Sequence, residues 1–287
     1  MIVDCHCHAG RGDRLTGPWD DAGLGRYLAR AERAGIDRTV LYPAFHRDYA
    51  VANRYLAGIV AARPERFLGF AFVHADRDAG RIAALVRTAV CEYGFVGIKV
   101  HRNDAPITRE VCDAARYFGL PVVYDPMGEV AVAELLAEHY PDVPFVLPHL
   151  GSFADDWRAQ LALVDHLVRH PNIHTDTSGV RRFDLLVEAV RRAGPLKVLF
   201  GSDGPWLHPG VELAKVRALG LGAEAEGWVL SGNLLALVRG ERRGAGPARP
   251  ERPSPAVNPA VTGGRSQAYR SPLRSRRRAG GAGAPGP

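Results

Sequence analysis

Residues 2–8, IVDCHCH, form the stretch that decides the fold and first points to chemistry. Its apolar opening predicts a buried strand, and side chains along a strand alternate between two faces. The alternation places Asp4, His6 and His8 on one face and Cys5 and Cys7 on the other. Two imidazoles on one face at a strand end can bind a divalent ion. The alternatives are a buried histidine pair bonded to backbone and a zinc knuckle, which lacks a second Cys or His pair nearby.

Short apolar runs alternate with amphipathic stretches along the next two hundred residues. The runs predict strands at 2–8, 38–43, 67–74, 96–101, 121–125, 144–149, 173–176 and 197–201. Helices are predicted at 23–34, 49–63, 81–93, 108–118, 130–140, 155–170, 183–193, 209–219 and 224–238. Strands that alternate with helices indicate βα units and a parallel sheet.

Eight such units favour an α/β fold, a closed (β/α)₈ TIM barrel. No Gly-x-Gly-x-x-Gly follows a strand, which disfavours a doubly wound dinucleotide-binding sheet. The barrel domain is predicted over residues 1–240. Residues 241–287 contain eight Pro, eight Gly and almost no large apolar side chain, so we predict a disordered Arg/Pro/Gly-rich tail.

The basic charge belongs to that tail. It holds ten Arg, no Lys and two Glu, a net +8, whereas residues 1–240 carry a net −2 of the overall +6. Nucleic-acid binding by the core is therefore not expected. Four cysteines are too few for a disulfide scaffold. With no signal peptide and no membrane-spanning run evident, we expect a cytoplasmic protein, alone or as a homo-oligomer, with a small-molecule substrate.

Ionisable residues recur where the later strands end. They include Lys99 and His101, Asp125, His149, Asp176 and Asp203. The carboxyl ends of barrel strands share one face, where barrel enzymes carry their active sites. An Asp or Ser at any one of these ends is explained by helix capping, but six strand ends, counting the one that carries His6 and His8, together predict a polar ring at the barrel mouth.

These motifs make the chain resemble the amidohydrolase superfamily, in its amidohydrolase-related (type 2) branch of metal-dependent TIM-barrel hydrolases. The resemblance covers about residues 1–240. It rests on the His6-x-His8 pair, Gly97-Ile-Lys99, Pro148-His149-Leu-Gly, Asp176-Thr-Ser, Gly201-Ser-Asp203 and Gly232-Asn233.

The resemblance implies one divalent ion, held by His6, His8, Asp125, His149 and Asp203. Asp203 resembles the eighth-strand aspartate, which ligates the ion and acts as general base. His149 resembles the sixth-strand histidine, which polarises a carbonyl or ligates. The family usually has a histidine where this chain has Asp125. Zinc is expected, and the added carboxylate leaves manganese or magnesium as alternatives.

The catalytic set is therefore predicted as Asp203, His149 and Lys99, with Lys99 binding a substrate carboxylate or stabilising an oxyanion. A carbamylated Lys99 that bridges two ions is the alternative. His101, His174, Trp206 and His208 are candidate substrate contacts, with packed or solvent-exposed side chains as the other interpretation.

Three functions follow as hypotheses. The first is metal-dependent hydrolysis of an amide, ester or lactone bond in a small carboxylated molecule. The second is non-oxidative decarboxylation on the same scaffold, and the third is a non-catalytic barrel.

Overall fold

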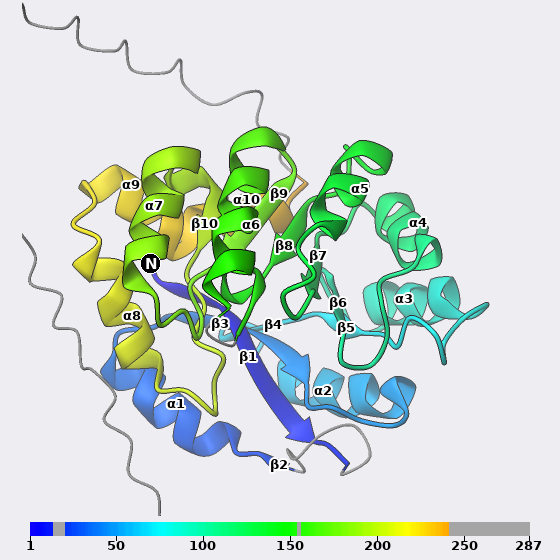
Figure 1. Ribbon diagram of the computed structural model, residues 1–287. Helices are drawn as coiled ribbons and strands as arrows, with labels where there is room; N and C mark the ends of the chain where they lie inside the picture. Colours follow the sequence, from blue (N-terminus) through cyan, green and yellow to red (C-terminus); the bar gives the residue numbers. More distant parts are fainter. Residues whose placement is uncertain (14–20, 154–155, 241–287) are drawn as a thin grey trace, which may run out of the picture. The chain divides into compact units, whose positions relative to one another are not determined.

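Parallel strands followed by helices curve into a closed barrel in the computed structural model, which describes residues 1–13, 21–153 and 156–240 (Figure 1). The strands that surround the barrel are β1 (Val3–Arg11), β3 (Arg38–Pro43), β4 (Phe67–Gly69), β5 (Ala71–Phe72), β6 (Ile98–His101), β7 (Val122–Asp125), β8 (Phe145–Leu147), β9 (Ile173–Asp176) and β10 (Val198–Leu199). Neighbours pair in parallel from β1 to β4 and from β5 to β10. The predicted TIM barrel is confirmed.

Two seams close the ring. The amide of Cys5 donates to the carbonyl of Phe200 at 2.9 Å, which joins the first strand to the end of the last. The predicted strand 67–74 is broken at Phe70 into β4 and β5, because β4 pairs with β3 while β5 pairs with β6. Phe70 bridges the break by donating its amide to Leu41 at 3.1 Å.

The helices lie close to their predicted positions. They are α1 (Leu24–Arg33), α2 (Tyr49–Ala62), α3 (Ile82–Cys91), α4 (Arg109–Phe118), α5 (Val132–His139), α6 (Trp157–Arg169), α7 (Phe183–Ala193), α8 (Pro209–Ala218), α9 (Ala223–Gly227) and α10 (Asn233–Val238). A π-helical turn, η3 (Trp228–Gly232), joins the last two. Local chemistry sets the ends: the Asp48 side chain accepts from the amide of Ala50 where α2 begins.

A bulge in β1 changes the predicted alternation of its side chains. The pairing of β1 with β3 shifts register between Asp4 and Cys7. Cys5 consequently packs inside the barrel with Val3 and Val40, whereas Cys7 packs among the outer core. The prediction that Asp4 shares a face with His6 was wrong, because the extra residue lets Cys5 and His6 both turn inward.

Asp4 instead contacts the outer helix α1. Its carboxylate accepts from the Tyr27 hydroxyl at 2.7 Å and from the Ser202 amide at 2.9 Å. Asp4 is fully buried, and burial, partly offset by these hydrogen bonds, raises its pKa to about 6. The residue ties β1 to α1 and to the loop after β10.

Two apolar cores support the barrel. The inner one gathers Val3, Cys5, Val40, Tyr42, Phe70, Val123, Val146, Leu199 and Leu234. The larger one lies between the strands and the helices that surround them. A two-residue strand, β2 (Asp21–Ala22), pairs antiparallel with the end of β1.

The predicted disordered tail, residues 241–287, lies outside the described residues, so that prediction and the domain boundary at 240 stay predictions. Among the residues that are described, no helix is both long and apolar enough to cross a membrane.

Candidate active site

A cavity of about 310 Å³ opens at the carboxyl ends of the strands. It is lined by His6, His8, Phe45, Lys99, His101, Asn103, Asp125, Met127, His149, Ser152, Phe153, Asp203 and Trp206. Most of the predicted site residues therefore meet in one place. Two predicted substrate contacts, His174 and His208, are not among the lining residues.

His6, His8 and Asp203 converge at this cavity. The Nε2 atoms of His6 and His8 lie 3.6 Å and 3.8 Å from Oδ1 of Asp203. All three residues are buried. The strand β1 supplies both imidazoles, and the loop after β10 supplies the carboxylate, so barrel closure itself assembles the trio.

The far nitrogen of each imidazole is already engaged. His6 Nδ1 lies 2.8 Å from Oδ2 of Asp176, and His8 Nδ1 lies 3.1 Å from the Pro43 carbonyl. Both acceptors favour a proton on Nδ1, which leaves the Nε2 lone pairs directed toward Asp203. Neutral imidazoles backed by acceptors and joined by a carboxylate fit a divalent ion.

Burial keeps these rings neutral. Desolvation, followed by the nearby Lys99, lowers the pKa of His6 to about 3. Desolvation also lowers the pKa of His8 well below its ordinary range. A ring that stays unprotonated near neutral pH can donate its lone pair to an ion.

Asp176, on β9, belongs to the site, although the sequence pattern alone assigned it no role. Besides His6 it binds the His149 amide at 3.0 Å and the Ser178 hydroxyl at 2.6 Å. Burial opposes its ionisation, but His6, His149 and these hydrogen bonds outweigh burial and hold its pKa below the ordinary range. Asp176 therefore orients the His6 ring and fixes the backbone of His149.

His149 follows β8 in a left-handed backbone conformation, with φ of 58°, and Leu150 follows with φ of 53°. Such angles are costly outside glycine and cluster at functional sites. His149 Nδ1 lies 2.8 Å from the Ser178 carbonyl, so its Nε2 faces the cavity side and lies 3.5 Å from Asp125. His149 thus presents a lone pair from the end of β8.

Asp125 lies beside His101 and His149, outside the group formed by His6, His8 and Asp203. Its Oδ1 accepts from the Met127 amide at 2.8 Å, and its Oδ2 lies 3.2 Å from His101 Nε2. His101 Nδ1 accepts from the Asn103 amide, so its Nε2 carries the proton toward Asp125. Since both carboxylate oxygens have partners, the predicted role of Asp125 as a metal ligand gains no support from this geometry.

Lys99 and Asp203 bring opposite charges to the cavity. Lys99 is fully buried, with Nζ 3.5 Å from His6 Nε2, and desolvation lowers its pKa despite the surrounding carboxylates. Burial raises the pKa of Asp203 to about 7, although His149 and Lys99 oppose that shift. Asp203 also adopts a left-handed backbone, with φ of 54°. The site therefore combines a buried cation with a carboxyl that can exchange a proton near neutral pH.

Aromatic side chains form the other walls. The Trp206 ring lies 4.7 Å from the His8 ring, and the Phe45 ring stacks on His8 at 6.0 Å. Phe153 meets the His149 ring edge-on at 5.1 Å. The cavity thus pairs charged groups at its base with a flat apolar wall.

His174 and His208 lie elsewhere. His174 sits in the second position of β9, and its Nδ1 is buried with no hydrogen-bond partner among the described residues. His208 is exposed and accepts from the Gly210 amide as the N-cap of α8. Neither position supports the predicted substrate contact.

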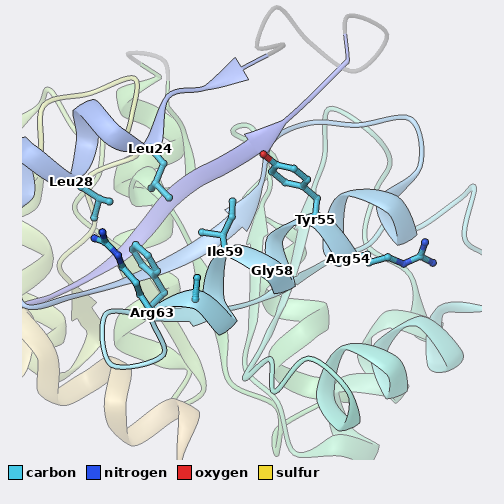
Figure 2. Close-up of a pocket in the computed structure, with 9 residues that line it drawn as sticks. Leu24, Leu28, Arg54, Tyr55, Gly58, Ile59 and Arg63 are labelled. Atoms are coloured by element: carbon cyan, nitrogen blue, oxygen red, sulfur yellow. The ribbon is translucent and has the colours of Figure 1, made fainter.

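A second hollow, of about 600 Å³, lies on the barrel flank between α1 and α2. Figure 2 shows Leu24 and Leu28 of α1 facing Tyr55 and Ile59 of α2 around it. Of the residues that the structure describes, its lining includes Arg54 and Arg63 but no acid, histidine or cysteine. This composition lacks the groups for acid–base or metal chemistry.

Comparison with solved structures gives the same fold. The 5-carboxyvanillate decarboxylase LigW of Sphingomonas paucimobilis superposes with a TM-score of 0.65 at 17% identity, covering 83% of this chain and 98% of the other. A dihydroxybenzoic acid decarboxylase of Polaromonas, with bound manganese and 2-nitroresorcinol, gives 0.62 at 18%, covering 84% and 98%. A probable 2-pyrone-4,6-dicarboxylic acid hydrolase of Acinetobacter baumannii gives 0.64 at 15%, covering 83% and 99%.

No curated protein matches the sequence. The amidohydrolase family, in contrast, matches residues 3–239. That range contains the complete barrel and the His6, His8 and Asp203 trio. The chain belongs to the amidohydrolase family.

Proposed function

We propose that the chain is a metal-dependent hydrolase that acts on an amide, ester or lactone bond of a small carboxylated molecule. The observation that carries the proposal is the convergence of His6, His8 and Asp203 beside Lys99 in one cavity. A divalent ion, with zinc expected and manganese or magnesium as alternatives, would supply Lewis-acid polarisation and an acidified water there. His6, His8 and Asp203 would hold it, with His149 within reach.

The side chains of this chain then have distinct tasks. Asp203 accepts the proton of the attacking water at a carboxylate oxygen and returns it to the leaving group. Its carboxylate lies beside the Nε2 atoms of His6 and His8, where an attacking water would be held. The buried ammonium of Lys99 binds the substrate carboxylate, where low dielectric strengthens the attraction. Trp206 and Phe45 cover His8 and limit the access of bulk water.

Non-oxidative decarboxylation is the second candidate, favoured by the aromatic side chains that line the same cavity as Lys99. A planar aromatic carboxylate would stack on Phe45, Phe153 or Trp206 with its charge at the base of the cavity. The bond between ring carbon and carboxylate breaks, and its electron pair stays on the carbon. Asp203 then delivers a proton to that carbon, and carbon dioxide leaves.

Isotopic products separate the two reactions. Metal-loaded protein is incubated with ester, lactone, amide and aromatic carboxylate panels in ¹⁸O-labelled water and, separately, in D₂O. Hydrolysis places ¹⁸O in the new carboxylate and releases no carbon dioxide. Decarboxylation releases carbon dioxide and places deuterium on the former carboxylate-bearing carbon.

The Asp203→Asn variant is the matched control, because asparagine tolerates the left-handed backbone at this position. We expect turnover to fall by about 10²–10⁴-fold, the usual contribution of a positioned acid–base group. Equal turnover in Asp203→Asn and the unsubstituted protein would contradict both reactions. No turnover from metal-loaded protein on either panel would favour the non-catalytic barrel.

A further inference from the structure

A second group of potential metal ligands lies on the outer layer of the barrel. Glu134 of α5 meets His166 of α6 and His170, the residue that caps α6. One ligand atom from each of the three residues lies within 4.8 Å of the others. His166 is buried, and Glu134 and His170 are partly exposed. None of the three lines the cavity at the barrel mouth.

The spacing of the two histidines places them one helical turn apart. Residues i and i+4 lie on the same helix face, and the two rings stack with centroids 5.7 Å apart and planes inclined by 21°. Glu134 supplies the third ligand from the neighbouring helix, 32 residues before His166 in sequence. Two imidazoles and one carboxylate form a common zinc ligand set, which leaves one position open for water.

Two of the three separations between the ligand atoms match tetrahedral coordination, and the third lies within 4.8 Å. Ligands held about 2.0–2.1 Å from a zinc ion lie roughly 3.3 Å from one another along the edge of a tetrahedron. Oε2 of Glu134 lies 3.4 Å from Nδ1 of His166 and 3.1 Å from Nε2 of His170. The carboxylate therefore stands at the required separation from both imidazoles without rearrangement of either helix.

A cationic side chain already occupies this neighbourhood. The Arg169 guanidinium donates to His166 Nδ1 at 3.2 Å and lies 3.3 Å from Oε2 of Glu134. His166 thus presents an Nδ1 lone pair, as a ligand must. The Arg169 side chain is 54% exposed, so it can turn into solvent when an ion takes its place.

We propose that Glu134, His166 and His170 form a second divalent-cation site of the zinc class, which joins α5 to α6. The site is separate from the barrel mouth and does not depend on the proposed function. Its ion has a structural role, since it links two helices that contribute no ligand to the mouth. Arg169 competes with the ion and sets its affinity.

Metal content of the full-length chain tests the proposal. Protein stripped with a chelator is dialysed against zinc, and bound metal is measured by mass spectrometry. We expect Glu134→Gln and His170→Ala to retain one equivalent fewer than the unsubstituted protein. The matched controls, Glu138→Gln and His139→Ala, alter exposed residues of α5 and should retain it. His8→Ala, which alters the mouth, should also keep the equivalent at α5 and α6.

Cobalt(II) supplies a readout independent of activity. The outer site should add visible absorption of tetrahedral cobalt that is lost in His170→Ala and kept in His8→Ala. Arg169→Met removes the competing cation, so it should tighten cobalt binding at this site by about tenfold or more, the scale typical of groups that neighbour a metal.

Equal metal content in His170→Ala and His139→Ala, both folded by circular dichroism, would overturn the proposal. If His170→Ala does not fold, unchanged cobalt affinity in Arg169→Met overturns it instead. If His8→Ala is the only one of these variants that loses metal, the proposed function stands and the site at α5 and α6 is refuted. Metal bound at α5 and α6 but not at the mouth would support this site and contradict the proposed function.

Discussion

His6 and Asp176 contact each other at the mouth of the barrel, with Nδ1 of the imidazole 2.8 Å from Oδ2 of the carboxylate. The two residues are 170 positions apart and come from β1 and β9. The contact decides which nitrogen of His6 carries the proton, and so decides whether Nε2 can bind an ion.

Replacing Asp176 with Asn should therefore weaken metal binding at the mouth. The Asn oxygen is needed by the His149 and Ser178 amides, so its NH₂ turns toward His6 Nδ1. His6 then shifts its proton to Nε2 and loses the lone pair that faces the cavity. We expect a drop of about 10–100-fold in affinity, measured by competition with a chromogenic chelator. Asp184→Asn on the surface of α7 is the control, and equal affinities of the two variants would rule out the orienting role.

Lys99→Met tests the carboxylate-binding role. Methionine keeps most of the buried volume and removes the charge. With an active substrate, KM for the free carboxylate should rise by about 30-fold or more, since a buried charge partner is worth roughly 2–5 kcal/mol. KM for the matching neutral ester should change far less. An equal rise in KM for both substrates would show that Lys99 does not bind the carboxylate.

His174 should add to the loss of stability in acid. Desolvation and, next, Lys197 lower its pKa from 6.5 to about 3 in the folded chain. The unfolded chain consequently binds one more proton between these values, so stability falls as pH drops from about 6.5 toward 3, by up to ~1.4 kcal/mol per pH unit. His174→Leu should flatten that slope in urea unfolding series. Exposed His139→Leu should leave it unchanged, and identical slopes for all three proteins would contradict the assignment.

Asp4→Ala should destabilise the barrel, although Asp4 itself does not line the cavity. Four donors lose their acceptor: the amides of His6 and Ser202 and the hydroxyls of Tyr27 and Ser202. Buried donors left unsatisfied cost about 1–3 kcal/mol each, so we expect a loss of roughly 3 kcal/mol or more in the free energy of unfolding. Asp4→Asn should lose less, because one oxygen remains. Calorimetry that gave the same Tm for Asp4→Ala and the unsubstituted chain would refute this.

The barrel was predictable from the sequence because its strands are short apolar runs and its helices show the apolar spacing of amphipathic helices. Every predicted helix has a counterpart within about two residues, except that the last is divided by the η3 turn. The bulge in β1 could not be read this way. An inserted residue leaves no mark in an alternating pattern, so the predicted face of Asp4 was wrong.

The site was predictable as a set of strand ends but not as a network. Residue type and position at strand ends predicted that one site would contain His6, His8, Lys99, His149 and Asp203, and all five line the cavity. The same reasoning could not separate a ligand from a residue that orients one. Asp125 and Asp176 both end strands, and only their contacts distinguish them. Asp125 binds Met127 and His101, whereas Asp176 binds His6. His174, the second residue of β9, and His208, the N-cap of α8, also show that a histidine in a βα unit need not line the cavity.

The seam between β1 and the segment after β10 also has a consequence for biosynthesis. Asp4 and Ser202, which bond across it, are separated by 198 positions. A ribosome that has made His6 and His8 must therefore add almost the whole barrel before Asp203 can reach them. During that interval the two imidazoles have no carboxylate partner from the last strand, and the first strand has an open edge. If the proposed ion binds at the mouth, His6, His8 and Asp203 can hold it together only after the amides of Cys5 and His8 have bonded to the carbonyls of Phe200 and Gly204.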